Sequence, residues 1–276
     1  MNLLDLANIS QGTLRGEPSN VESFSIDTRT IKPKEVYIAL KGENFDGHLF
    51  ITEAIKKGAS AIVLDRQVEC NIPNITVDDS YKFMNHVAVH NRNYFKGKMV
   101  GITGTNGKTT TKQIIANLLN SQGSCHQTIG NKNNQIGVPY SLLTLGNNHD
   151  YSVIEMGTSE PGEIKKLNTL VKPDIAAITN VSIGHLDGLR DTESIAIEKG
   201  NILNFWNEDG TAILPRDSNF YEYWSNETNA KQIISFGIHD DSDFKVSSIK
   251  IDVLNNLTHF RLRFDGKEEN FSINGI

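Results

Sequence analysis

The stretch GITGTNGKTTTKQ, from Gly101 to Gln113, decides the fold class of this 276-residue chain. Its glycines are three residues apart, and Lys108 and Thr109 directly follow the last of them. The common phosphate-binding loop has a glycine five places before its Gly-Lys-Thr, where this chain has Ile102. Glycines still let backbone N–H groups approach phosphate oxygens, and a following helix adds its positive N-terminus. The stretch therefore predicts a nucleoside triphosphate site between a strand and a helix.

Two side chains in this loop are suited to phosphate chemistry. Lys108 can reach the β- and γ-phosphates of a nucleotide, and the hydroxyl of Thr109 can ligate Mg²⁺. The alternative is a glycine-rich turn beside a surface lysine, and the strand before it and the helix after it argue against that. The residues predicted to bind the nucleotide are Gly104, Thr105, Asn106, Gly107, Lys108, Thr109 and Thr110.

From Met99 onward the chain alternates short apolar runs with helical patterns. The runs at 99–103, 151–157 and 173–181 are typical of parallel strands buried on both faces. Pro161 suits the first turn of a helix at 161–171, and a later helix is expected at 191–206. The helix after the loop carries an apolar stripe of Ile114, Ile115, Leu118 and Leu119. This alternation predicts an α/β domain with a mainly parallel, doubly wound sheet.

The last part of the chain changes pattern. Residues 243–254, 258–264 and 269–273 alternate apolar and polar side chains, and Asp265-Gly266 is a strong hairpin signal. An antiparallel β meander attached to the parallel sheet is therefore predicted. Since the chain stops at Ile276 in mid-pattern, we expect a truncated form of a longer protein.

The residues before the loop predict a separate small α/β domain. Strand patterns occur at 23–29, 35–40, 61–65 and 74–79, and Gly58 ends a helical pattern between the second and third. A further helix is expected at 80–95, where Phe83 and Val87 share one face. The polar Lys-Gly-Lys link at 96–98 then marks a boundary, so we predict domains at 1–97 and 98–276.

Composition excludes several classes of function. A formal net charge of -6 provides no basic face for nucleic acid, and no apolar run is long enough to cross a bilayer. The N-terminus has neither the basic start nor the apolar segment of a signal peptide. Cys70 and Cys125 have no metal-ligand spacing, which favours a reducing, cytoplasmic environment. We expect a monomer without nucleic-acid partners or membrane insertion.

Three stretches together resemble the Mur ligases, the ATP-dependent amide-forming enzymes of peptidoglycan precursor synthesis. They are GITGTNGKTTT, GNKNNQIGVPYSLL (130–143) and VIEMGTSEPGEI (153–164). Folate-glutamating relatives share the first in a variant form, whereas the other two resemble the D-alanyl-D-alanine-adding members. Members that add the third residue would show Thr-Thr-Pro after the loop helix and Ser-Ser-His after the glutamate. Residues 25–63 also resemble the family's UDP-sugar-binding domain.

The resemblance implies a reaction. An ATP-dependent ligase would join D-alanyl-D-alanine to a UDP-N-acetylmuramoyl-tripeptide through an acyl phosphate. One alternative is a truncated nucleotide-binding module without turnover, because the family's third domain, which closes over ATP, would lie beyond Ile276. The other is a different Mur or folylpolyglutamate-type amide ligase.

The resemblance also assigns catalytic and metal-binding roles. Glu155 ends a strand, where open α/β sheets place ligands, and would ligate Mg²⁺ with Thr109. His185, in TNVSIGHLDG, would ligate a second Mg²⁺. Lys199, in IEKGNI, would be carbamylated by CO₂ to give an anionic ligand, which requires a neutral amine and hence a lowered pKa. The implied catalytic residues are Lys108, Lys199 and His185.

Substrate contacts are implied at two further places. Asn133 and Asn134 lie in a loop that would face the acceptor peptide; the adjacent Gln135 stands where the family usually has Glu. Thr28 and Arg29, in IDTR, and the segment from Asp46 to His48, in FDGH, would hold the UDP portion.

Overall fold

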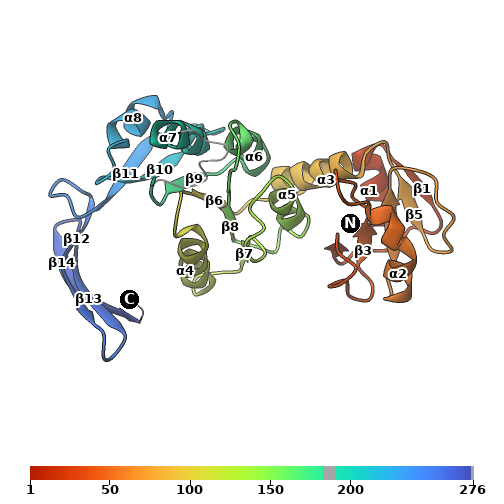
Figure 1. Ribbon diagram of the computed structural model, residues 1–276, viewed down its shortest axis with the longest axis horizontal. Coiled ribbons are helices and arrows are strands. Elements are labelled where there is room, and N and C mark those ends of the chain that lie inside the picture. The colour runs from red at the N-terminus through yellow and green to blue at the C-terminus, as the bar shows by residue number, and fades with distance from the viewer. Residues whose placement is uncertain (183–190, 275–276) are drawn as a thin grey trace. The chain divides into compact units, whose positions relative to one another are not determined.

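The structure is a computed structural model that describes residues 1–182 and 191–274. It divides into two compact units, which Figure 1 colours along the chain. The first unit consists of Met1–Lys96 and Ile136–His149, and the second consists of Gly97–Gln135 and Asp150–Ile276. His185 lies outside the described residues. No helix in the described part of the chain is long and apolar enough to cross a membrane.

The first unit is built on a five-stranded sheet of order β1-β5-β4-β3-β2. The four strands from β5 to β2 are parallel, and β1 is antiparallel to β5. This confirms the predicted small α/β unit. The strands are β1 (Thr13–Arg15), β2 (Phe24–Ser25), β3 (Val36–Ile38), β4 (Ala61–Leu64) and β5 (Asn74–Thr76). The helices are α1 (Leu3–Ser10), η1 (Gly47–Phe50), α2 (Ile51–Lys56) and α3 (Ser80–Tyr94).

A segment from later in the chain completes this unit. Helix α5 (Gly137–Leu142) packs against α3, where the amide of Asn91 donates to the carbonyls of Leu142 at 3.0 Å and Leu143 at 2.8 Å. The hydroxyl of Tyr140 donates to the carbonyl of Phe24 at 3.0 Å. Leu143 joins the same buried cluster as the α1 and α3 core residues. The sequence patterns had not indicated this insertion.

The second unit is built on a nine-stranded sheet of order β14-β13-β12-β11-β10-β9-β6-β8-β7. Pairing is parallel from β7 to β12 and antiparallel from β12 to β14. The predicted parallel sheet with an antiparallel meander is therefore confirmed. The strands are β6 (Lys98–Thr103), β7 (Cys125–Gln127), β8 (Tyr151–Glu155), β9 (Ile175–Ile178), β10 (Thr211–Pro215), β11 (Gln232–Gly237), β12 (Phe244–Asp252), β13 (Leu257–Phe264) and β14 (Lys267–Asn274).

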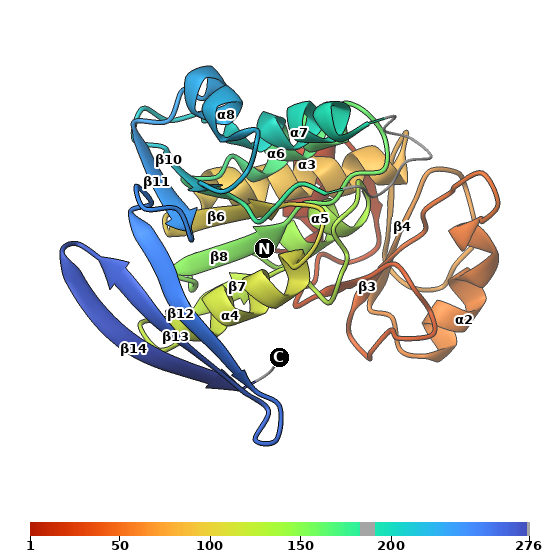
Figure 2. The same ribbon diagram turned by 60° about the vertical axis from the view of Figure 1, so that its left-hand side comes forward.

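Helices cover both faces of the parallel part of this sheet. In Figures 1 and 2, helix α4 lies on one face, and α6, α7 and α8 lie on the other. The indole of the fully buried Trp224 in α8 donates to the carbonyl of Ala196 in α7 at 3.0 Å, which joins two of these helices. The helices are α4 (Lys108–Asn120), α6 (Glu163–Val171), α7 (Thr192–Gly200), η2 (Asn201–Leu203) and α8 (Tyr221–Glu227).

The apolar stripe predicted for α4 is partly wrong. Ile114 is 54% exposed and Leu118 is 65% exposed. The side of α4 that faces the sheet instead carries Lys112, which is only 2% exposed, with Ala116 one turn later. The pattern of apolar residues could not reveal a buried lysine, because its burial depends on carbonyl partners from distant residues.

The backbone confirms the predicted hairpin turn but not the predicted place of Pro161. Asp265 and Gly266 both have positive φ, at 48° and 69°, as a two-residue hairpin turn between β13 and β14 requires. This prediction is confirmed. Pro161 is not in the first turn of α6, because Gly162 is the N-cap and the helix begins at Glu163.

Candidate active site

The phosphate-binding loop follows β6 directly, and its glycines are required by geometry. Gly104 has a φ of 152°, and a Cβ there would lie 1.8 Å from the Thr179 hydroxyl oxygen. Gly107, with a φ of 77°, is the N-cap of α4 and forms no side-chain cap. The first N–H groups of α4 are therefore directed out of the helix end, as in sites that bind phosphate.

The loop is fastened to the segment that follows β9. The backbone N–H of Thr105 donates to the carbonyl of Asn180 at 2.9 Å, and that of Asn106 donates to the side-chain oxygen of Asn180 at 3.1 Å. The Thr179 hydroxyl donates to the carbonyl of Asn106 at 2.7 Å. Asn180 and Thr179 therefore shape the loop, a role that the sequence analysis missed.

The side chain of Lys108 folds back onto the phosphate-binding loop. Its ammonium donates to the carbonyls of Gly104 at 2.9 Å and Thr105 at 3.0 Å. Burial lowers the pKa of Lys108, while the negative charge of Glu155 acts in the opposite direction. A cation held at this place is suited to neutralise phosphate oxygens. Thr110, by contrast, is exposed in the first turn of α4.

Glu155 is the centre of a polar cluster at the carboxyl end of β8. Its side chain is 1% exposed and accepts hydrogen bonds from the Thr109 hydroxyl at 2.9 and 3.1 Å. The amide of Asn133 donates to the same carboxylate at 2.6 Å. The backbone N–H of Glu155 donates to the Thr128 hydroxyl at 2.8 Å. The structure therefore brings together Thr109, Asn133 and Glu155, three residues that the sequence analysis had placed in two different sites.

The donor set around Glu155 fits Mg²⁺. A carboxylate and a hydroxyl are hard oxygen ligands, and phosphate-binding loops hold Mg²⁺ with few protein ligands and with phosphate oxygens. Among the described residues, no group of three or more His, Cys, Asp or Glu side chains could hold a metal alone. A Mg²⁺ ion held by Thr109 and Glu155 would take its further oxygen ligands from a bound nucleotide or from water.

Lys199 is a buried lysine in the last turn of α7. It is 2% exposed, and its ammonium forms no hydrogen bond with any other residue in the described ranges. Burial and the positive charge of Lys108 lower the pKa of Lys199 to about 8, against the opposing effect of Glu198. The structure thus provides the lowered pKa that a carbamylated lysine needs.

Glu198, next to Lys199, was not identified from the sequence. Its carboxylate accepts hydrogen bonds from the backbone N–H groups of Gly162 at 2.7 Å and Ile164 at 2.8 Å. It therefore caps the N-terminus of α6 and fixes α7 beside it. Asn201 donates to the same carboxylate at 3.3 Å.

The remaining loop residues have different surroundings. Asn134 is exposed, whereas Gln135 donates from its amide to a carboxylate oxygen of Glu163 at 2.7 Å. Glu163 in turn accepts hydrogen bonds from the backbone N–H groups of Ser159 at 2.6 Å and Glu160 at 3.1 Å. Gln135 is therefore suited to this position as an amide donor, because a carboxylate there would face the carboxylate of Glu163.

In the first unit, Thr28 and Arg29 follow β2. Thr28 is buried, and its carbonyl accepts a hydrogen bond from the ammonium of Lys57 at 2.8 Å. The side chain of Arg29 is 85% exposed and pairs with Asp27, with 2.7 Å between the closest atoms. The structure thus leaves the guanidinium of Arg29 at the surface and turns Thr28 inward.

Asp46 and His48 follow the neighbouring strand β3. The ring of His48 lies between two carboxylates, with Nδ1 at 2.8 Å from Asp46 and Nε2 at 3.1 Å from Asp65. Desolvation tends to raise the pKa of Asp46, but hydrogen bonds from His48 and Arg66 outweigh it and lower that pKa to about 2. Asp46 therefore remains anionic, and His48 holds the loop in shape.

The two loops lie in one neighbourhood of the first unit. The pKa of the buried Tyr37 in β3 is raised to about 12 by burial and then by the negative charges of Asp27, Glu53 and Asp46. The loops after β2 and β3 therefore both place carboxylates near one ring, as expected for the carboxyl ends of adjacent parallel strands.

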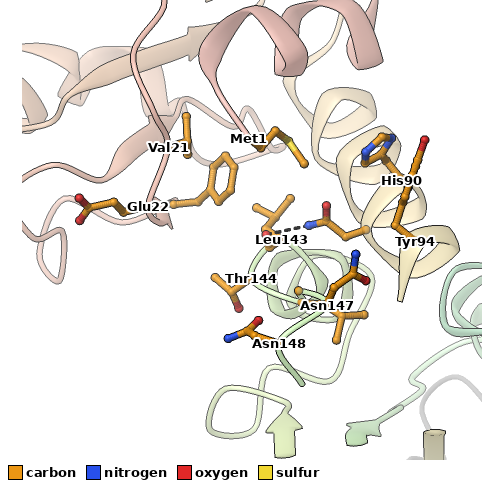
Figure 3. Close-up of a pocket in the computed structure, with 13 residues that line it drawn as sticks. Met1, Val21, Glu22, His90, Tyr94, Leu143, Thr144, Asn147 and Asn148 are labelled. Carbon is orange, nitrogen blue, oxygen red and sulfur yellow. Dashed lines mark hydrogen bonds between the residues drawn. The ribbon is translucent and has the colours of Figure 1, made fainter. Parts of the chain in front are cut away.

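A pocket of about 500 Å³ lies elsewhere in the first unit, as Figure 3 shows. None of the predicted substrate residues lines it. It lies where the end of α3 and the segment after α5 meet the start of the chain, with Met1, Leu143 and Tyr94 in its wall. The pocket thus forms where the inserted segment, Ile136–His149, packs against the rest of the first unit.

Comparisons with known proteins cover both units. A model of the Mur ligase middle domain matches residues 102–275, and a model of the Mur ligase family catalytic domain matches residues 20–96. UDP-N-acetylmuramoyl-tripeptide–D-alanyl-D-alanine ligase of Escherichia coli (strain K12) is 33% identical over 252 residues, covering 91% of this chain and 56% of the relative. The same-named ligase of Bacillus subtilis (strain 168) is 34% identical over 275 residues, covering 98% and 58%. This chain spans little more than half the length of these relatives.

Solved structures agree with this similarity. MurF from Acinetobacter baumannii superposes with a TM-score of 0.87 at 27% identity, covering 99% of this chain and 60% of that chain. MurF ligase from Thermotoga maritima, solved in complex with ADP, superposes with a TM-score of 0.78 at 29% identity, covering 92% and 58%. The fold of both units is therefore shared with these proteins.

Proposed function

The chain belongs to the Mur ligase family, and we propose that it carries the acceptor- and ATP-binding parts of a D-alanyl-D-alanine-adding ligase. The proposed acceptor is a UDP-N-acetylmuramoyl-tripeptide, and the reaction is a step of peptidoglycan precursor synthesis. The observation that carries the proposal is the cluster of Lys108, Thr109 and Glu155 at one end of the parallel sheet. The names of the similar ligases support the choice of substrates.

The proposed chemistry has two steps. A carboxylate oxygen of the acceptor peptide attacks the γ-phosphorus of ATP, the bond to the bridging oxygen breaks, and ADP leaves. The amine of D-alanyl-D-alanine then attacks the carbonyl carbon of the acyl phosphate, the amide bond forms, phosphate leaves, and the amine loses a proton. Because two anions meet in the first step, catalysis depends on positive charge and positioning rather than on a protein nucleophile.

The residues of the second unit have separate roles in this scheme. Lys108 exchanges the carbonyls of Gly104 and Thr105 for phosphate oxygens, and the first N–H groups of α4 bind the same phosphates. When bound, Mg²⁺ supplies further positive charge, and Thr109 and Glu155 are the residues that would hold it. His185 and a carbamylated Lys199 are proposed for a second ion. Asn133 holds the Glu155 carboxylate, and the exposed Asn134 is proposed to contact the acceptor.

The surroundings of the Lys199 amine support the proposed carbamate. An amine with a pKa near 8 is partly neutral at physiological pH, and only the neutral form adds to CO₂. Glu198 positions this lysine by joining α7 to the start of α6. The carbamate would convert a buried cation beside Lys108 into an anion.

The first unit is proposed to hold the UDP portion of the acceptor. Arg29 offers an exposed guanidinium for phosphate oxygens. Asp46, fixed by His48 and Arg66, offers an acceptor for sugar or base N–H and O–H groups. Thr28, being buried, would contribute through its backbone. A cytoplasmic location is proposed, in keeping with the two free cysteines.

ATP binding provides the first test of the proposal. Mg-ATP should bind to the 276-residue chain, and Lys108→Ala should lose most of that affinity. Lys165→Met, at an exposed position of α6, is the matched control and should bind as the wild type does. Equal ATP affinity for the wild-type and Lys108→Ala proteins in calorimetry would reject the site.

Turnover provides the second test. Joined to the remaining part of a family member, the chain should extend the UDP-sugar tripeptide only when ATP and D-alanyl-D-alanine are present. Activity with a single amino acid but none with the dipeptide would point to a different Mur or folate-type ligase. If the 276-residue chain alone forms the amide bond, the alternative of a binding module without turnover is excluded.

A further inference from the structure

Lys112 is a buried lysine that has no part in the proposed chemistry. It lies one turn after Lys108 on α4, faces the sheet, and is 2% exposed. No carboxylate in the described part of the chain pairs with it. Burying an ammonium group is costly unless hydrogen bonds replace its water. The partners that it does have therefore point to its role.

The partners of Lys112 are two backbone carbonyls that follow β7. Its ammonium donates to the carbonyl of Gly130 at 2.6 Å and to the carbonyl of Thr128 at 3.1 Å. Figure 2 shows α4 beside β7 and β8. The two hydrogen bonds therefore join the helix to the loop that follows β7. Gly130 has a φ of 57°, and the chain turns there toward Asn133.

The segment that Lys112 holds carries two attachments of Glu155. The hydroxyl of Thr128 accepts a hydrogen bond from the backbone N–H of Glu155 at 2.8 Å. The amide of Asn133 donates to the Glu155 carboxylate at 2.6 Å. The backbone N–H of Gly157 also donates to the carbonyl of Asn133 at 2.8 Å, which closes the loop on the end of β8.

We propose that Lys112 is a positioning residue that orients the Glu155 carboxylate through the segment from Thr128 to Asn133. Helix α4 thus holds Glu155 twice, directly through Thr109 and indirectly through Lys112. The inference deepens the proposed function, since it rests on Glu155 as the acidic ligand beside the nucleotide. Groups that orient a metal ligand affect metal affinity more than they affect contacts elsewhere in the site.

The inference can be tested by measuring ATP affinity with Mg²⁺ and with EDTA. Lys112→Met keeps the length and apolar character of the side chain but removes its donors. The gain in ATP affinity that Mg²⁺ brings should fall by about 10- to 100-fold, the usual effect of removing a group that orients a metal ligand. Affinity in EDTA, which depends on Lys108 and the loop, should change by less than about threefold. Lys165→Met is the matched control and should leave both values unchanged.

A double-mutant cycle separates positioning from general loss of structure. Asn133→Ala should lower the Mg²⁺-dependent gain by itself, and combining it with Lys112→Met should add little, because both act through one segment. Additive effects, or equal losses with Mg²⁺ and EDTA, would overturn the inference. If Lys112→Met does not fold, Asn133→Ala alone decides, since an unchanged Mg²⁺-dependent gain in that variant also overturns it.

The wild-type protein separates this inference from the proposed function. If it binds Mg-ATP while Lys112→Met binds with the same Mg²⁺ dependence, only the role of Lys112 is rejected. If the wild-type protein does not bind Mg-ATP, the nucleotide site is rejected and the role of Lys112 with it.

Discussion

Carbamate formation on Lys199 should depend on how much of its buried amine is deprotonated. The folded protein lowers the pKa of this lysine from 10.5 to about 8. At pH 8 the neutral fraction is then about one half, against ~0.3% for an unperturbed lysine, a difference of ~160-fold in reactive amine. Because each carbamate formed from the neutral amine also releases a proton, the ratio of carbamylated to uncarbamylated Lys199 at a fixed concentration of dissolved CO₂ should rise about 100-fold per pH unit below pH 8 and about 10-fold per pH unit above it.

The assay is ¹³C NMR of the 276-residue chain in buffers that contain ¹³C-labelled bicarbonate. The α-amino group of Met1 also titrates near this pH and can form a carbamate. The quantity to follow is therefore the difference between the wild-type and Lys199→Arg spectra, because a guanidinium is not carbamylated. Lys250→Arg, at an exposed position, should give the wild-type spectrum.

Two results would refute the reasoning about Lys199. The first is a wild-type spectrum identical to that of Lys199→Arg at pH 8 and above, which would mean that no carbamate forms there. The second is a carbamate ratio that keeps its steeper rise up to about pH 10, which would mean that burial and Lys108 do not lower the pKa. Either result would return Lys199 to the role of a buried structural lysine.

Three other perturbations have expected outcomes. Gly104→Ala would place a Cβ 1.8 Å from the Thr179 hydroxyl oxygen, so ATP affinity should fall by at least ~10-fold through displacement of the loop; calorimetry with near-wild-type affinity would contradict this. Glu198→Gln can satisfy fewer of the N–H groups at the start of α6, so unfolding in urea should show a loss of about 1–3 kcal/mol; an unchanged midpoint would contradict the capping role. Asp46 has a pKa lowered to about 2 in the folded state, below its unfolded value. Its stabilising contribution is therefore present above about pH 4 and lost as the pH falls toward 2, and Asp46→Asn should reduce the difference in urea midpoint between pH 3 and pH 6.

Sequence patterns correctly predicted elements whose backbone conformation depends on neighbouring residues in the chain. The helix at 80–95 was expected from Phe83 and Val87 on one face, and both residues are buried in α3. The turn at Asp265-Gly266 was expected because a two-residue hairpin needs positive φ at both positions. In each case the backbone conformation of the element is set by residues that are close in sequence, as in the side-chain cap of Asp79 on the first turn of α3.

The candidate site was predictable only where a motif carried its own geometry. Lys108 and Thr109 were identified because a glycine loop before a helix allows few arrangements. Asn180 and Glu198 were missed because their partners lie 74 and 34 to 36 residues away and leave no periodic signal. The burial of the Lys199 side chain was likewise not predictable from the sequence, since it depends on the packing of α6, α7 and α8.

The sequence by itself determined the succession of strands and helices, the phosphate-binding loop and the family. These features follow from side-chain periodicity, from the backbone freedom of glycine and from the order of residues in short motifs. Only the tertiary structure decided that α5 completes the first unit and that Lys112 faces inward to hold the loop beside Glu155. Those outcomes depend on burying polar groups against partners far along the chain, and such partners exist only after the chain has folded.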